Sequence, residues 1–178
     1  MTPTRISCLA LALAFSAPQF ARSEDPKLPA AARRPPAIPD SALNAKVLKQ
    51  VGLAYQANVE PLLKRACFDC HSTQTVFPWY HHIPGVAQYL DHHVEEALKR
   101  LDLGDGFPFK AKSPIVFRVR GIGRTVQRGS MPLWDYKLMH PASRLSVEEK
   151  KVITDWSEES FQKLSETAKP YKVAIPQR

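Results

Sequence analysis

A length of 178 residues predicts a single domain, and the formal net charge of +8 makes the chain basic. No basic run is interleaved with aromatic residues, so we expect no nucleic acid partner. The charge is explained either by solubility or by docking to an acidic protein or an anionic surface. Three cysteines are too few for a disulfide framework.

The first 23 residues are predicted to be a secretory signal peptide. Arg5 precedes an apolar run at 6–15, which is too short to span a bilayer as a helix. Small-x-small sites lie at 14–16 and 21–23, and we favour cleavage after the second. The mature chain is then expected in the periplasm with no transmembrane segment. Its charge would be +6, because the removed segment carries two arginines and no acidic residue (+8 − 2).

Residues 24–40 are expected to form a tether. This segment holds five prolines and several alanines but almost no large apolar residue, a composition typical of a semi-extended chain. The folded domain is therefore expected at residues 41–168. The polar tail at residues 169–178 carries two further prolines and is not expected to pack.

Residues 41–66 are expected to be helical. Pro61 suits the first turn of a second, short helix that leads toward Cys67. The apolar residues available for one buried stripe are Leu43, Val47, Leu48, Val51, Leu53 and Tyr55.

Three more helices are predicted further along the chain. Residues 92–103 form an amphipathic segment, and residues 115–126 carry apolar side chains mostly at helical spacing. The last helix is expected to begin at Ser146, because Glu149 three residues later completes a capping box. The loop at 104–114 has no evident role, and no segment alternates convincingly like a strand. These patterns predict an all-α fold with long loops.

The stretch "CFDCH" at residues 67–71 is the centre of the chemistry, because Cys67 and Cys70 are the two cysteines left after signal cleavage. A thioredoxin-like dithiol lies at a helix start after a strand, whereas here a helical segment leads into the pair. A structural zinc site needs four convergent ligands. The histidine pairs at 81–82 and 92–93 are adjacent in sequence, so their side chains point in different directions.

Covalent haem attachment fits this stretch better. In that chemistry two thiols add across the vinyl groups of haem, and the following histidine ligates the iron from the proximal side. One helical turn sets both sulfur atoms over one edge of the ring and directs the imidazole at its centre. We therefore predict one haem c and its iron, held by Cys67, Cys70 and His71.

A second axial ligand is expected on the opposite face of the haem. Met131 is the first candidate, because it lies in the non-helical, proline-containing stretch "RGSMPLWDY" between two helical segments. Ligation by methionine and histidine raises the reduction potential of haem iron. The rivals are Met139 and His140 and, for bis-histidine ligation, His81, His82, His92 and His93.

Three stretches resemble, in order, the blocks of the bacterial haem-binding domain family, a group of short cytochrome c-like proteins. They are "CFDCHSTQTVFPWY", "DHHVEEALKRLDL" and "SMPLWDYKLMHPASRLSVEEKKVITDW". The resemblance covers residues 45–157, and the sequence departs from the family mainly in the loop "GDGFPFKAKSP". It implies a cytochrome c-like helical fold in the periplasm. It also implies one c-type haem on Cys67 and Cys70, with His71 as proximal and Met131 as distal ligand.

Polar residues around these motifs receive simpler interpretations. The second ring nitrogen of His71 needs a partner, for which we expect a backbone carbonyl in the turn at 77–84. His92 and His93 follow Asp91, which is interpreted as a helix start with a solvent-facing pair. Three arginines that could neutralise haem propionates are expected on a solvated helix face: Arg118, Arg120 and Arg124.

The sequence is thus interpreted as a periplasmic electron carrier that meets redox partner proteins, acidic ones among the candidates, and not as an enzyme. Two other functions compete with this interpretation. One is a haem peroxidase-like enzyme with an open distal site, and the other is a haem sensor or accessory subunit of a larger complex. A low-spin spectrum with a methionine-to-iron band would favour the carrier, and a high-spin spectrum would contradict it.

Overall fold

A computed structural model describes Asp40 and residues 43–167. The predicted signal peptide (1–23), the tether up to residue 39 and the tail (169–178) lie outside the described residues, so these boundaries stay predictions. The all-α prediction is confirmed, because the described residues are mostly helical and contain no strand. No helix among them is long and apolar enough to cross a membrane.

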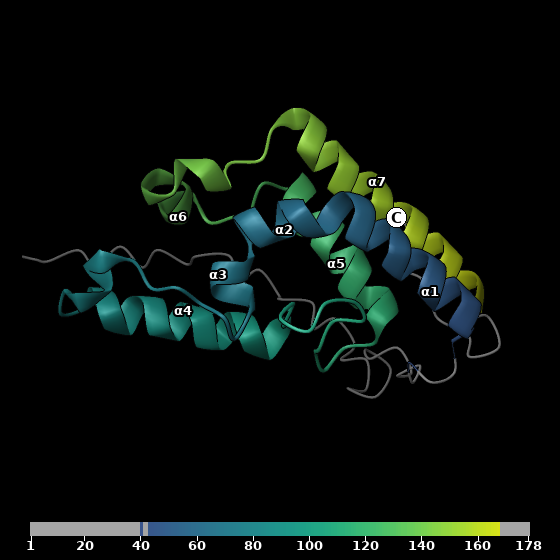
Figure 1. Cartoon of the computed structure of the whole chain (residues 1–178), viewed down its shortest axis with the longest axis horizontal. Coiled ribbons are helices and arrows are strands. Elements are labelled where there is room, and N and C mark those ends of the chain that lie inside the picture. Colours follow the sequence, from purple (N-terminus) through teal and green to yellow (C-terminus); the bar gives the residue numbers. More distant parts are fainter. Residues whose placement is uncertain (1–39, 41–42, 168–178) are drawn as a thin grey trace, which may run out of the picture. The chain divides into compact units, whose positions relative to one another are not determined.

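The described part of the chain is a series of α-helices joined by loops and by short 3-10 and π-helical turns (Figure 1). In chain order the elements are α1 (Ala45–Ala54), the π-helical turn η3 (Tyr55–Val59), α2 (Glu60–Ala66), α3 (Phe68–His71), the 3-10 turn η4 (Trp79–His82), α4 (Val86–Arg100), α5 (Ile115–Gln127), α6 (Trp134–Met139), the 3-10 turn η5 (Pro141–Ser143) and α7 (Val147–Thr167).

The first helical segment follows the prediction with one exception. Pro61 lies in the first turn of α2, as expected. Val51 and Tyr55 are buried one turn apart. Leu53, by contrast, is 56% exposed, and the expectation that it belongs to the buried stripe was wrong. It lies two residues from each of the buried pair, so the helical rotation of about 100° per residue places it on the opposite face.

Helices α5 and α7 form the main packed pair and lie side by side (Figure 1). The two helices approach closely at Gly123, where a Cβ atom would come within 2.2 Å of Ser157 Oγ. The whole predicted apolar stripe of α5 is buried: Ile115, Val116, Val119, Ile122 and Val126. The spacing of these residues therefore identified the core face of the helix correctly.

The predicted capping box of the last helix is confirmed. Ser146 Oγ accepts a hydrogen bond from the Glu149 N–H at 3.1 Å, and Glu149 Oε2 accepts one from the Ser146 N–H at 2.8 Å. Each side chain thus satisfies a backbone donor that the first turn leaves without a helical partner. This is why α7 begins at Val147.

The start of α4 was predicted wrongly. The helix begins at Val86, five residues before Asp91, and ends at Arg100. It follows Gly85, whose φ of +85° suits a residue without a Cβ atom. Gln88 Oε1 accepts a hydrogen bond from the Gly85 N–H at 2.7 Å, so a glutamine side chain takes the capping role.

The loop at 104–114 contributes to the hydrophobic core. Phe109 is fully buried, and its ring meets that of Tyr55 edge-on at a centroid distance of 5.0 Å. Phe107 packs beside it against the same ring, with centroids 6.3 Å apart. The loop therefore closes one side of the core, a role that the sequence did not reveal.

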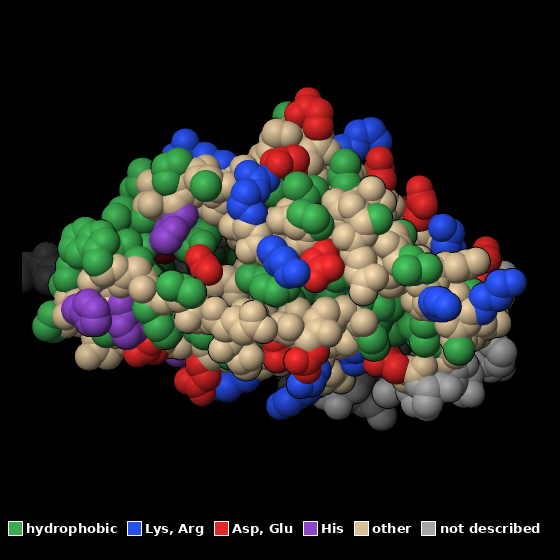
Figure 2. All heavy atoms as spheres, viewed as in Figure 1, with side chains coloured by type: hydrophobic (Ala, Val, Ile, Leu, Met, Phe, Trp, Pro, Cys, Tyr) green, Lys and Arg blue, Asp and Glu red, His purple; other side chains and the backbone are tan. Residues whose placement is uncertain are grey.

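Apolar and charged side chains are unevenly distributed over the described surface (Figure 2). Hydrophobic and histidine side chains gather on the end that carries α6 and the start of α4, whereas lysines, arginines and carboxylates are spread along α1 and α7. Trp79 in η4 and Trp134 in α6 are both 76% exposed. Apolar side chains of this size are usually exposed singly on a monomer, so this end of the domain is distinct from the rest.

Candidate functional site

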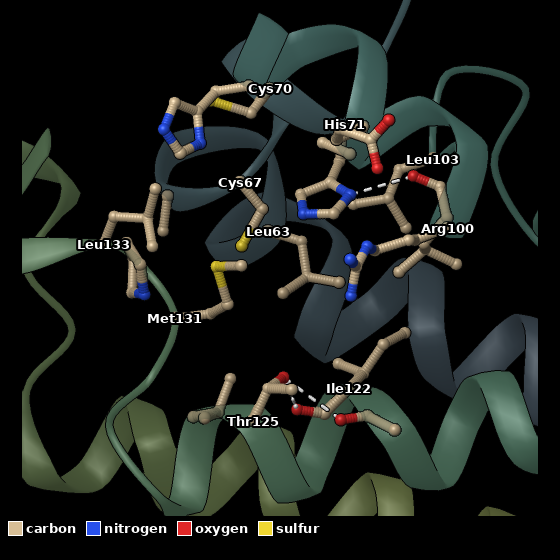
Figure 3. Close-up of a pocket in the computed structure, with 18 of the residues that line it drawn as sticks. Leu63, Cys67, Cys70, His71, Arg100, Leu103, Ile122, Thr125, Met131 and Leu133 are labelled. Atoms are coloured by element: carbon tan, nitrogen blue, oxygen red, sulfur yellow. Dashed lines mark hydrogen bonds between the residues drawn. The ribbon is translucent and has the colours of Figure 1, made fainter. Parts of the chain in front are cut away.

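One cavity of about 600 Å³ brings together the four residues that the sequence singled out (Figure 3). Cys67, Cys70, His71 and Met131 all line it. Residues of α4 and α5 form much of the remaining wall: His92, His93, Glu96, Ala97 and Arg100 from α4, and Phe117, Arg118, Gly121, Ile122, Thr125 and Val126 from α5. Residues from the two halves of the sequence thus meet at one site.

The two cysteines and the histidine occupy one helical turn. The N–H of Cys67 donates to Leu63 O at 2.8 Å, which continues the path of α2 into the motif. Cys67 O then accepts hydrogen bonds from the N–H groups of Cys70 at 3.2 Å and His71 at 2.9 Å. This turn holds both thiols and the imidazole at one end of the cavity. The cysteines are not joined by a disulfide.

His71 is held by the segment that follows α4. Its Nδ1 lies 2.8 Å from Leu101 O, and its own carbonyl oxygen accepts a hydrogen bond from the Leu103 N–H at 2.7 Å. The expectation of a partner in the turn at 77–84 was therefore wrong, because the end of α4 lies against α3. A carbonyl can only accept, so Nδ1 carries the proton and Nε2 keeps its lone pair.

Burial governs the ionisation of these groups. It lowers the pKa of His71, which favours the neutral imidazole that a metal requires. Burial also raises the pKa of Cys67 to about 12 and raises the pKa of Cys70, with the carboxylate of Asp69 acting in the same direction. A redox dithiol needs a lowered thiol pKa, so this pair does not resemble a thioredoxin-like site.

Met131 lines the same cavity from the non-helical stretch between α5 and α6. Its N–H donates to Thr125 O at 3.4 Å, which ties this stretch to the last turn of α5. Figure 3 shows the side chains of Met131 and Cys67 directed into the same space. The rival Met139 is 54% exposed and does not line the cavity. His140 is also absent from the lining, and its Nε2 lies 2.6 Å from Tyr80 Oη.

The other candidate histidines fall into two groups. His81 pairs with Asp91 at 2.8 Å, and neither His81 nor His82 lines the cavity. His92 and His93 do line it, so the expectation of a solvent-facing pair was incomplete. They lie in the middle of α4, because the helix begins earlier than predicted. The helical spacing of residues 93, 96, 97 and 100 was the sequence signal that could have identified this cavity wall.

The short helix after Met131 is held by two tyrosine hydrogen bonds, one to the cysteine motif and one to α4. Tyr136 Oη donates to Asp69 Oδ2 at 2.5 Å, and Tyr89 Oη donates to Asp135 Oδ2 at 2.5 Å. The Tyr136 ring also stacks on His140 at a centroid distance of 4.3 Å. Burial and the carboxylate of Asp69 both raise the pKa of Tyr136, which keeps its hydroxyl a donor. No residue of α6 is buried, so these hydrogen bonds contribute to its attachment.

The arrangement fits a haem. The cavity volume lies within the range of cofactor sites, roughly 300–1,000 Å³. His71 Nε2 has a free lone pair, the two thiols lie one helical turn apart, and a thioether lines the cavity from a different element. Gly121 on α5 borders the same space, and a Cβ atom there would meet no atom within 4 Å. Open space beside a helix backbone allows a flat ligand to approach closely.

Comparison with known proteins gives one result. The model of the haem-binding domain family matches residues 36–159, which is more than half of the chain. No curated protein matches the chain, and no solved structure does. The matched range contains the cysteine motif, His71 and Met131, so the family and the cavity point to the same cofactor. The chain is therefore a haem-binding protein and belongs to the haem-binding domain family.

Proposed function

We propose that this protein is a monohaem c-type cytochrome with a cytochrome c-like fold. Cys67 and Cys70 would hold the haem through thioether bonds, and His71 and Met131 would ligate the iron. The observation that carries the proposal is that these four side chains, from two distant parts of the sequence, line one cavity. A haem iron with histidine and methionine ligands exchanges single electrons with partner proteins.

The chain supports this function by holding the ligands and by lining the cavity with apolar side chains. Leu101 O fixes the orientation and tautomer of His71, and hydrogen bonding of this kind also increases the basicity of the ligating nitrogen. Apolar side chains such as Leu63, Ile122 and Val126 line the cavity. A low-dielectric wall disfavours additional charge on the iron, so the surroundings and the methionine ligand both favour a high reduction potential.

We further propose that the protein works in the periplasm. The signal peptide predicted at residues 1–23 supports export, and covalent haem attachment is consistent with that compartment. The net charge of +6 expected after signal cleavage (+8 − 2) favours acidic redox partner proteins. Contacts between electron-transfer proteins are small and transient, so such a partner would bind weakly and the affinity would fall with ionic strength.

A peroxidase-like enzyme is the second candidate function, and one observation favours it. His92 and His93 line the cavity, and an imidazole near an open iron site could act as an acid and base toward peroxide. That function needs a free distal position, whereas Met131 also lines the cavity. A haem sensor would need a ligand-dependent change, for which no residue in the described part of the chain provides an argument.

The optical spectrum of the protein tests the proposal, after export from cells that co-express the cytochrome c maturation machinery. A low-spin, six-coordinate ferric spectrum with a methionine-to-iron band is expected. A high-spin ferric spectrum combined with turnover of hydrogen peroxide would instead support the enzyme. Matched spectra of the ferrous protein with and without carbon monoxide show whether the distal position is closed.

A further inference from the structure

Two arginines line the cavity, and they differ in what their guanidinium groups bind. The guanidinium of Arg118 binds groups of the protein itself. Its nitrogen atoms donate to the carbonyl oxygens of Phe109, Ala111 and Ser113, and it forms an ion pair with Asp40 at 3.1 Å. It therefore fixes the loop that precedes α5 and has little capacity left for a ligand.

Arg100, the last residue of α4, has a different environment. Figure 3 shows its side chain directed into the cavity beside His71. Within the described part of the chain, its guanidinium makes no hydrogen bond or ion pair, and it acts electrostatically on Glu96. Glu96 is already paired with Lys99 at 3.1 Å. Arg100 thus offers its donors to whatever fills the cavity.

The position of Arg100 relative to the cysteines indicates which part of a bound haem would face this arginine. In Figure 3, Cys67 and Cys70 lie on one side of His71, and Arg100 lies on the other. The vinyl and propionate substituents of haem occupy opposite edges of the macrocycle. If the vinyl edge is bonded to the cysteines and His71 lies beneath the centre, the propionate edge faces the side of Arg100.

We propose that Arg100 forms the carboxylate-binding subsite of this cavity and pairs with a haem propionate. The inference rests on the proposed covalent haem. It adds that Arg100 neutralises the haem edge that lies opposite the cysteines. A guanidinium matches a carboxylate with two parallel hydrogen bonds, which are stronger than neutral ones. The two ends of the cavity would then differ, with the thiols at one end and a positive charge at the other.

The midpoint reduction potential of the haem-loaded protein tests this subsite. Arg100→Gln should lower the potential, because an unneutralised propionate stabilises the ferric state. It should also move the pH dependence of the potential to higher pH, because the loss of a nearby cation raises the propionate pKa. Arg100→Lys keeps the charge and should restore most of the wild-type potential.

Lys99→Gln is the matched control. It removes one positive charge from the neighbouring position of the same helix, and Lys99 does not line the cavity. Equal shifts in Arg100→Gln and Lys99→Gln would overturn the subsite, because only general charge would then be at work. Mass spectrometry of the wild-type protein is done first. A missing haem adduct there would refute the covalent attachment, whereas an adduct with no specific Arg100 effect would refute the subsite alone.

Discussion

His71 Nδ1 lies 2.8 Å from the carbonyl oxygen of Leu101, thirty residues further along the chain. The two residues are joined a second time nearby, since His71 O accepts a hydrogen bond from the Leu103 N–H. The end of α4 therefore holds both the ring and the backbone of the proposed proximal ligand. This pairing leaves Nε2 as the one ring nitrogen with a lone pair for iron.

Replacing the proposed distal ligand should change the spectrum without preventing haem attachment. In Met131→Ala the methionine-to-iron band is expected to disappear and the ferric haem to become high-spin or to bind an external ligand. The reduction potential should fall, because the thioether favours ferrous iron. Absorption spectra and potentiometry measure both effects.

Met139→Ala is the control for that variant, because Met139 lies nearby in sequence but outside the cavity lining. It should keep the band and the wild-type potential. A band that survives in Met131→Ala and vanishes in Met139→Ala would reverse the assignment. A band that survives in both would mean that either methionine can ligate the iron, because the one other methionine, Met1, lies in the predicted signal peptide.

The hydrogen bond from Tyr136 to Asp69, called here the tyrosine attachment of α6, should determine how firmly the neighbouring Met131 is held. Tyr136→Phe removes the hydrogen bond to Asp69, and hydrogen bonds to charged groups contribute about 1.5–3 kcal/mol. Because Asp69 is only partly buried, we expect a loss of about 1.5 kcal/mol in the free energy of unfolding. Urea denaturation of the haem-loaded protein measures it, and the methionine band should weaken as well.

Trp134→Phe in the same helix provides the comparison for Tyr136→Phe, since Trp134 is largely exposed. Its effect on stability and on the band should be small. If both substitutions behave alike, the hydrogen bond to Asp69 does not hold α6, and the tyrosine attachment would have to be abandoned.

The close contact between α5 and α7 predicts a strong effect of one methyl group. In Gly123→Ala the new Cβ would lie 2.5 Å from Ser157 Cβ, so the helices must separate. Overpacking of this kind costs about 1–3 kcal/mol, which should appear as a lower urea midpoint. In a Ser157→Gly background the same substitution should be tolerated. Equal costs in both backgrounds would show that the contact is not the cause.

Some of this structure follows directly from the sequence. The core face of α5 was predictable because Val119, Ile122 and Val126 recur at helical spacing. The start of α7 was predictable because Ser146 and Glu149 satisfy local backbone donors. The thiols and imidazole of the cysteine motif share one turn, so their proximity needs no tertiary information.

Other features depend on contacts between distant segments and could not be read from the sequence. The partner of His71 is a backbone carbonyl, which every residue possesses, so no side chain marks Leu101 for this role. The start of α4 was missed because its cap uses Gly85 and Gln88, whereas the acidic Asp91 looked like a better cap. The failure to predict His92 in the cavity wall followed from that error.

The most direct test of the central claim is the mass of the exported protein and of its peptide containing residues 67–71. Co-expression with the cytochrome c maturation machinery should give a mass increased by one haem, retained after denaturation. Cys67→Ala and Cys70→Ala should each leave a single thioether, and the double variant should carry none. If the purified wild-type chain shows unmodified cysteines at both positions, the covalent haem is contradicted.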